Sequence, residues 1–139
     1  MRVVKSFLIS LAVLLVLPVL LFGLVRLSGS KQAITHYADR EILRAVFESS
    51  AGISADAELA NVRRKALLGK IPEGASREEV YRKLAADRIG CVPAAADTKA
   101  SKVECMTLGH SYDFRWLFVF YFDADNKLID VQVSTVKGA

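Results

Sequence analysis

The pattern of hydrophobic positions changes twice along the chain, from a continuous apolar stretch to segments of helical period and then to segments of period two. Residues 6–25 contain no charged side chain and are almost all Leu, Val, Ile or Phe. A helix of that length is about 30 Å long, which matches the thickness of a bilayer core. We therefore predict a transmembrane helix, with residues 1–30 forming a cytoplasmic tail, the anchor and a short linker.

A cleaved signal peptide is the alternative, because Ser28 and Ser30 are small residues that suit a cut after Ser30. The apolar region of a signal peptide is usually about 7 to 15 residues long, so the length favours an uncleaved anchor. A short basic tail, here Arg2 and Lys5, usually stays in the cytoplasm, and domain-sized segments are translocated largely regardless of charge. We expect the C-terminal domain to lie outside the cytoplasm.

Residues 31–50 predict an amphipathic juxtamembrane helix, within a segment that extends to residue 53. Ile42 and Val46 recur at helical spacing with Ile34, while Arg40 and Arg44 fall on another face. Such a helix acts as a stalk or packs on the domain. The alternative is a helix that lies on the membrane surface or associates with a second copy.

Two further helices are predicted. The first covers residues 55–68, with an apolar side formed by Leu59, Val62, Ala66 and Leu67. Its basic side, Arg63 to Lys65, is expected to be solvated, with contact to anionic lipid headgroups as the alternative. The second begins after Ser76, because Ser76 and Glu79 form a capping box, and we expect it to end near Ile89, with Gly90 as its left-handed terminator.

After a loop at 93–101 the period becomes two, which predicts strands at 102–108, 115–122 and 128–136. The segment 109–113 is a turn region, and residues 123–126 connect the last two strands as a hairpin. Pairing Phe122 with Lys127 keeps apolar residues opposite one another and places Phe118 opposite Val131. The same register pairs Phe120 with Ile129 and Trp116 with Val133.

The strand at 115–122 is apolar on both faces. Its aromatic residues, Trp116, Phe118, Phe120 and Phe122, are expected to point onto the helices. The candidate interaction face is formed by the alternate residues Leu117, Val119 and Tyr121. Little chain remains to cover this second face, so we expect either that the helix at 31–50 folds across it or that a partner or second copy docks there.

The two cysteines, Cys91 and Cys105, are predicted to form a disulfide. One follows the capped helix and the other lies on the first predicted strand, and the loop between them has no other fastening. An even pair of cysteines is also compatible with an oxidising compartment. Two separate buried thiols are the alternative.

Composition and charge support a small folded domain on a membrane segment. The first 30 residues hold 20 apolar residues, and the remaining 109 hold 53, about 49 %, which is ordinary for a globular domain. The net charge is +4, but without Arg2, Lys5 and Arg26 the chain has 16 basic and 15 acidic residues. The near-neutral domain gives no reason to expect nucleic-acid binding.

We find no pattern that predicts a cofactor or a metal site. The two cysteines, His36 and His110 lack the spacing of zinc ligands, and Asp123 to Asn126 suits a hairpin better than a calcium loop. A Cys105/His110 nucleophile pair is conceivable, but no third group orients it. A small thiol-redox or other enzyme, or an inhibitor-like domain, is therefore the alternative to a non-enzymatic binding module.

The order of elements, with Gly74 and Ser76 at the turn, Val80 and Leu84 on the capped helix and Trp116 on the aromatic strand, resembles the SmpA/OmlA (BamE-like) family of bacterial envelope domains over residues 56–136. This chain differs in its helix exit at 84–93 and in lacking the family's lipid-anchor cysteine. The resemblance implies a BamE-like domain that acts by protein contact, which we assign to residues 54–139.

Together these observations predict an α+β protein: an N-terminal transmembrane helix, then two to three helices packed on a small antiparallel sheet of about three strands. Its expected place is the bacterial inner membrane, crossed once, with the C-terminal domain in the periplasm. We expect a scaffolding or protein-binding module with an envelope protein as its partner and self-association as a further option.

Overall fold

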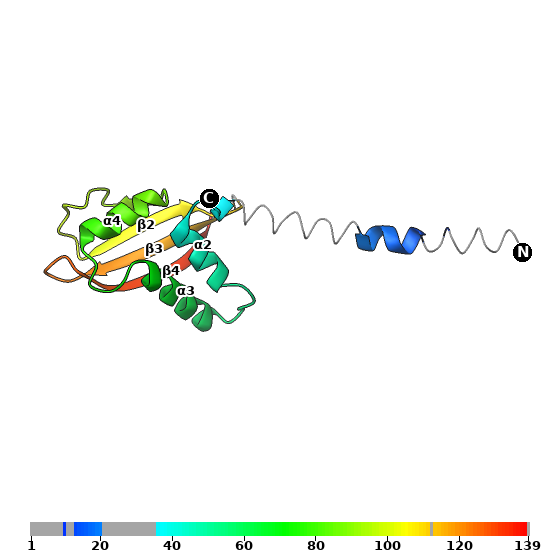
Figure 1. Ribbon diagram of the computed structural model, residues 1–139, viewed down its shortest axis with the longest axis horizontal. Coiled ribbons are helices and arrows are strands. Elements are labelled where there is room, and N and C mark those ends of the chain that lie inside the picture. Colours follow the sequence, from blue (N-terminus) through cyan, green and yellow to red (C-terminus); the bar gives the residue numbers. More distant parts are fainter. Residues whose placement is uncertain (1–9, 11–12, 21–35, 112, 139) are drawn as a thin grey trace, which may run out of the picture. The chain divides into compact units, whose positions relative to one another are not determined.

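Figure 1 shows the computed structural model, which describes residues 10, 13–20, 36–111 and 113–138. The chain divides into two compact units, Met1–Thr35 and His36–Ala139. In the first unit, residues 13–20 are helical. The predicted transmembrane helix and its linker lie largely outside the described residues, and within those that are described no helix is both long and apolar enough to cross a membrane.

The second unit is built on one antiparallel sheet whose strands follow sequence order. The strands are β1 (Gly90–Val92), β2 (Lys102–Leu108), β3 (Phe114–Phe122) and β4 (Leu128–Lys137). The predicted α+β class and antiparallel sheet are confirmed. The sheet has four strands rather than about three, because the exit from the last helix forms a strand of its own.

The strand that the sequence analysis missed is β1. Gly90 does not end the preceding helix in a left-handed conformation; Arg88 takes that role with φ of 58°, and Gly90 opens the strand. A run of three residues is too short to show alternation, so the sequence pattern carries no signal for it.

Three helices pack on one face of the sheet: α2 (Glu41–Ser49), α3 (Asp56–Lys70) and α4 (Arg77–Ala86) (Figure 1). The predicted cap of α4 is confirmed, since the Ser76 hydroxyl accepts a hydrogen bond from the Glu79 N–H at 3.2 Å. The helix ends at Ala86 rather than near Ile89.

The prediction of one continuous helix over 31–50 is wrong for its described part. A turn at residues 38–39 separates a short helical turn from α2, and residues 31–35 lie outside the described residues. Arg40, expected on a solvated face, is buried, and its guanidinium donates to the Asp87 carbonyl at 2.9 Å and to Thr107 Oγ1 at 2.7 Å. The break lets Asp87 Oδ2 accept two N–H groups in the first turn of α2, from Ile42 at 2.8 Å and Leu43 at 3.0 Å.

The basic side of α3 is only partly solvated, which corrects the sequence prediction. The Arg63 guanidinium lies 4.9 Å from the centre of the Trp116 ring, and Arg64 Nε donates to Asp130 Oδ1 at 2.8 Å. Lys65 is exposed as expected. The long side chains of two arginines therefore pack against the sheet with their polar ends at its surface.

The hairpin between β3 and β4 is confirmed, but its register differs from the predicted one by two residues over most of its length. Phe118 pairs with Val133 rather than Val131, and Phe120 pairs with Val131 rather than Ile129. In the same way Trp116 pairs with Thr135 rather than Val133, and Phe122 with Leu128 rather than Lys127.

Two single-residue changes produce this shift: five residues rather than four connect Phe122 to its partner Leu128, and a bulge next to Tyr121 accommodates one additional residue of β4. As a result both Leu128 and Val131 turn to the core, while Ile129 is exposed. Leu128 also bonds outside the sheet: its N–H donates to the Ala75 carbonyl at 2.9 Å, and its carbonyl accepts from the Gly74 N–H at 2.8 Å.

The core lies between the helices and one face of the sheet. All four aromatic residues predicted to point onto the helices are at most 3 % exposed: Trp116, Phe118, Phe120 and Phe122. They form one cluster with buried residues of all three helices, including Val46, Leu67 and Val80.

Candidate functional site

The predicted disulfide is present. Cys91 and Cys105 are directly paired on β1 and β2, with their Cα atoms 4.0 Å apart and their sulfur atoms bonded. The bond holds the short edge strand, and the start of the loop that follows it, against the sheet. The alternative of two separate buried thiols is wrong, and no cysteine in the described part of the chain is free.

Leu117, Val119 and Tyr121 lie on the face of the sheet opposite the helices, because side chains alternate along β3. We call this side the open face. It consists of Gly90 and Val92 from β1, of Lys102, Glu104, Met106 and Leu108 from β2, of Arg115, Leu117, Val119 and Tyr121 from β3, and of Asp130, Gln132, Ser134 and Val136 from β4.

None of the helices α2, α3 and α4 of the second unit covers the open face. The buried residues of α2 belong to the same core cluster as Trp116 and Phe118, so α2 lies on the helix side of the sheet. Val119 is 7 % exposed but stands outside that cluster; its cross-strand neighbours on the open face are Glu104 and Gln132. The described part of the predicted helix at 31–50 thus does not provide the cover that one of our alternatives required.

Three exposed apolar residues of this face were not predicted from the sequence: Val92, Met106 and Leu108, which are 77 %, 45 % and 43 % exposed. Met106 lies directly opposite Leu117. For β2 the sequence carries a signal, since Val103 and Cys105 alternate with Glu104 and Met106 along the strand.

The open face continues into a groove at the β4 edge of the sheet. The groove has a volume of about 530 Å³, and α3 lines one wall with Ala57, Ala60, Asn61 and Arg64. The opposite wall includes Leu117, Val119 and Gln132. The α3 wall is formed in part by the small side chains of Ala57 and Ala60, which leave the groove open toward the open face.

Charged and polar groups frame the apolar centre. Arg64 donates to Asp130 and lies 3.4 Å from Glu73, and the hydrogen bond from Arg64 lowers the pKa of Asp130 below its usual value. Tyr121 Oη donates to Gln132 Oε1 at 3.3 Å. These groups are mutually paired, so the polar rim is already satisfied before any partner binds.

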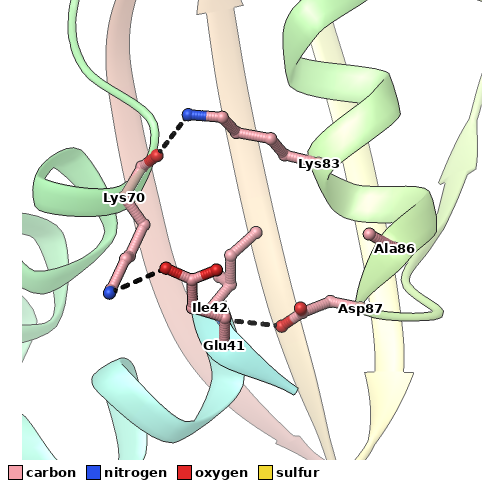
Figure 2. Close-up of a pocket in the computed structure, with 6 residues that line it drawn as sticks. All are labelled: Glu41, Ile42, Lys70, Lys83, Ala86 and Asp87. Carbon is pink, nitrogen blue, oxygen red and sulfur yellow. Dashed lines mark hydrogen bonds and ion pairs between the residues drawn. The ribbon is translucent and has the colours of Figure 1, made fainter. Parts of the chain in front are cut away.

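A second cavity lies between α2, the end of α3 and α4 (Figure 2). Its polar side chains are engaged with one another: Lys70 pairs with Glu41 at 2.9 Å, and Lys83 donates to the Lys70 carbonyl at 2.8 Å. Asp87 completes the wall as the cap of α2. With a volume of about 110 Å³, it is smaller than the roughly 300 Å³ typical of ligand pockets, and we interpret it as a packing junction.

Cys105 and His110, the residues of the alternative thiol-enzyme hypothesis, do not form a nucleophile–base pair. Cys105 is fully buried in its disulfide, and His110 bonds to Tyr37 instead. In the hairpin, the Asp123 carboxylate accepts the N–H groups of Asp125 and Lys127, each at 2.9 Å. That carboxylate therefore closes the turn. Among the described residues no three His, Cys, Asp or Glu side chains converge on a common point.

Comparisons of the chain with protein-family models, with curated proteins and with solved structures found no match.

Proposed function

We propose that this protein is a membrane-anchored module of the bacterial envelope that binds another protein through the open face of its sheet. The observation that carries the proposal is the apolar centre of that face, where Met106 and Leu117 pair across strands and neither α2, α3 nor α4 lies over them. Apolar side chains on an antiparallel sheet are usually turned to a core, and a contiguous exposed set marks an interaction site.

The energetics are compatible with a moderate, specific interaction. Burying side chains such as Met106, Leu117 and Tyr121 contributes about 1.5 to 3 kcal/mol each, against which stand the costs of association. The groove beside α3 offers a place for a side chain of the partner. A partner with a complementary apolar patch of its own fits this surface better than a highly charged one.

The proposed location is the inner membrane, with the domain in the periplasm. Residues 6–25 have the length and composition of a membrane-spanning helix. The Cys91–Cys105 disulfide fits an oxidising compartment. A non-enzymatic role by protein contact is also what the resemblance to the SmpA/OmlA (BamE-like) family implies.

The location is tested with compartment-specific reporters fused after Ala139 in the full chain. We expect activity from a reporter that works only in the periplasm and none from one that works only in the cytoplasm. The mature N-terminus is sequenced in parallel. A cytoplasmic signal, or a mature chain that begins at Lys31, would contradict the anchored arrangement.

The binding face is tested with a photo-crosslinking amino acid placed at Met106 in the full chain in its native membrane. A matched probe at Ala85, which is exposed on α4, reports the helix side. We expect a defined adduct from the Met106 probe only. An adduct of twice the chain mass identifies a second copy as the partner, and any other defined mass identifies a different protein.

The double variant Met106→Lys with Leu117→Asp is then expected to abolish the adduct formed from a probe at Leu108. Val119 is left unchanged because it is too buried to be substituted safely. The control introduces the same charges elsewhere, as Ala51→Asp with Ala85→Lys, at two exposed positions. Equal adducts from both sides, or loss of the adduct in the control, would refute the assignment of the open face.

A further inference from the structure

A third pocket lies on the helix side of the sheet, away from the open face. It has a volume of about 250 Å³ and is formed where the end of α2, the middle of α3 and the start of β3 meet. Three aromatic rings, those of Phe47, Phe114 and Trp116, make up most of its wall. The polar side chains at its wall are Ser50, Arg63, His110 and Thr135.

The hydrogen bonds of Tyr37 determine which groups His110 can offer to this pocket. The buried Tyr37 hydroxyl accepts from Trp116 Nε1 at 2.9 Å and from the His110 backbone N–H at 3.0 Å. With both acceptor positions used, its own proton is donated to His110 Nδ1 at 3.2 Å. The neutral imidazole therefore carries its proton on Nε2, which has no partner among the described residues.

Arg63 supplies a cation that no carboxylate neutralises. Its Nε donates to Ser50 Oγ at 3.1 Å, and its guanidinium lies over the Trp116 ring. Within the described residues its terminal amino groups make no hydrogen bond or ion pair, and partial burial lowers the pKa of Arg63 from its usual value. The neighbouring Arg64, in contrast, is paired with Asp130 and Glu73.

The groups of Arg63 and His110 that make no hydrogen bond within the described residues are therefore all hydrogen-bond donors. Ser50 is already engaged, since its hydroxyl donates to the Val46 carbonyl and accepts from Arg63. Donors without a matching carboxylate favour an anion, and an arginine fork suits a carboxylate in particular. The aromatic wall favours a flat or branched apolar group attached to it.

The Phe114 ring lies against the backbone of Gly109. A Cβ atom added at Gly109 would overlap the Phe114 ring, so a larger residue at this position would displace it. His110 also stacks edge-on with Phe114, with ring centres 5.2 Å apart. The wall is therefore ordered by packing before any ligand enters.

We propose that this pocket binds a small aromatic carboxylate, with the Arg63 guanidinium and His110 Nε2 holding the carboxylate and Phe47, Phe114 and Trp116 holding the ring. The volume is suited to a group the size of one aromatic amino acid rather than to a nucleotide or a larger cofactor. The same chemistry occurs in a free aryl acid and in the C-terminal residue of a peptide. The proposal is independent of the open face.

The test uses phenylacetate and the full chain in detergent micelles, with Trp116 as the probe. Trp116 is the one tryptophan of the sequence, so its emission reports the pocket directly. We expect a saturable change with a dissociation constant on the order of 1 mM, as suits a ligand of about ten non-hydrogen atoms. Phenylacetamide, which has the same shape without the charge, should bind at least about tenfold more weakly.

Two variants identify the cation. Arg63→Gln is expected to weaken phenylacetate binding by about tenfold or more, while Arg64→Gln, one residue away on the same helix, should leave it unchanged.

A second experiment distinguishes a peptide C-terminus from a free aryl acid as the source of the carboxylate. The affinity of acetyl-glycyl-phenylalanine is compared with that of its C-terminal amide and with that of phenylacetate. Tighter binding of the free-acid peptide than of phenylacetate indicates a polypeptide C-terminus, and the reverse order indicates a free aryl acid.

The comparison of phenylacetate with phenylacetamide needs no variant. It therefore tests whether the pocket binds a carboxylate even if Arg63→Gln fails to fold. Equal affinity for the acid and the amide, or no saturable change with either, would overturn the proposal. Unchanged phenylacetate binding by folded Arg63→Gln protein would overturn it as well. None of these outcomes depends on whether a protein binds the open face.

Discussion

Both faces of β3 carry apolar side chains, but the two faces meet different surroundings. Phe118 and Phe120 are fully buried beneath the helices, whereas Leu117 and Tyr121, which alternate with them along the same strand, remain partly accessible. Val119 lies between these cases, since it is 7 % exposed but stands outside the core cluster. The difference arises from what lies over each side, because α2, α3 and α4 all pack on one of them.

This comparison separates apolar residues that hold the domain together from apolar residues that are available for contact. Antiparallel sheets with one solvated side usually place polar residues there, and the ends of the open face follow that rule with Arg115, Asp130 and Gln132. Its centre, around Met106 and Leu117, does not. The energetic consequences of substitution should therefore differ sharply between neighbouring positions.

The largest effect is expected from truncating the core face. Phe118→Ala should reduce the free energy of unfolding by about 3 to 5 kcal/mol, because it leaves a cavity in a fully buried cluster. Leu117→Ala, the adjacent residue on the open face, should cost less than about 1 kcal/mol. Urea unfolding of both variants measures the difference. Similar losses at the two positions would show that the open face is covered.

The second prediction concerns the edge of the sheet that the disulfide fastens. Reduction of the Cys91–Cys105 bond, which closes a loop with a sequence separation of 14, should lower stability by about 3 kcal/mol in the chain-entropy model. Thermal unfolding with and without dithiothreitol measures the loss. The variant with alanine at both positions should be as unstable as the reduced protein and should not respond to the reductant.

A smaller effect is expected from the helix layer. Asp87→Ala removes the carboxylate that accepts two N–H groups in the first turn of α2, and we expect a loss of about 2 kcal/mol. Asp87→Asn keeps an acceptor oxygen and should lose about half as much. Chemical denaturation compares the two variants, and an equal loss in both would show that the negative charge, rather than the hydrogen bonds, matters.

The smallest effect is a pH dependence that belongs to the helix side alone. Burial lowers the pKa of His110, the charge of His36 acts in the same direction, and Asp113 opposes them. As pH falls, the unfolded chain therefore binds this proton first, so stability is fully present above about pH 6.5 and declines as pH falls below it. Unfolding at pH 7.5 and 5.5 should show this decline, and His110→Gln should reduce it.

Local patterns were sufficient for several elements. The capping box at Ser76 predicted the start of α4 correctly, because a cap depends only on residues within one turn. Alternation predicted which side of β3 enters the core, since successive side chains of a strand must point to opposite faces. The disulfide was also correctly predicted, with Cys105 on the strand at 102–108, although the strand β1 that carries Cys91 was not.

The errors occurred where distant residues decide the outcome. A five-residue hairpin connection and the bulge next to Tyr121 each moved the register by one residue, and Leu128 at this point bonds to Gly74 and Ala75, which lie far away in the sequence. Burial of Arg40 depends on acceptors at Asp87 and Thr107, which no spacing in the sequence relates to it. In both cases the preference of a short segment was overridden by hydrogen bonds that form only after folding.

The sequence by itself determined the composition of each element and the side of β3 that must be buried, because these follow from backbone periodicity and from the free energy of removing apolar groups from water. Only the tertiary structure decided that all three helices pack on one face. It also decided that Arg63 lies over Trp116 with no carboxylate partner among the described residues while Arg64 is paired with Asp130, a distinction between adjacent residues with identical side chains. Such distinctions depend on which distant groups come within a few ångströms, and that is fixed by packing.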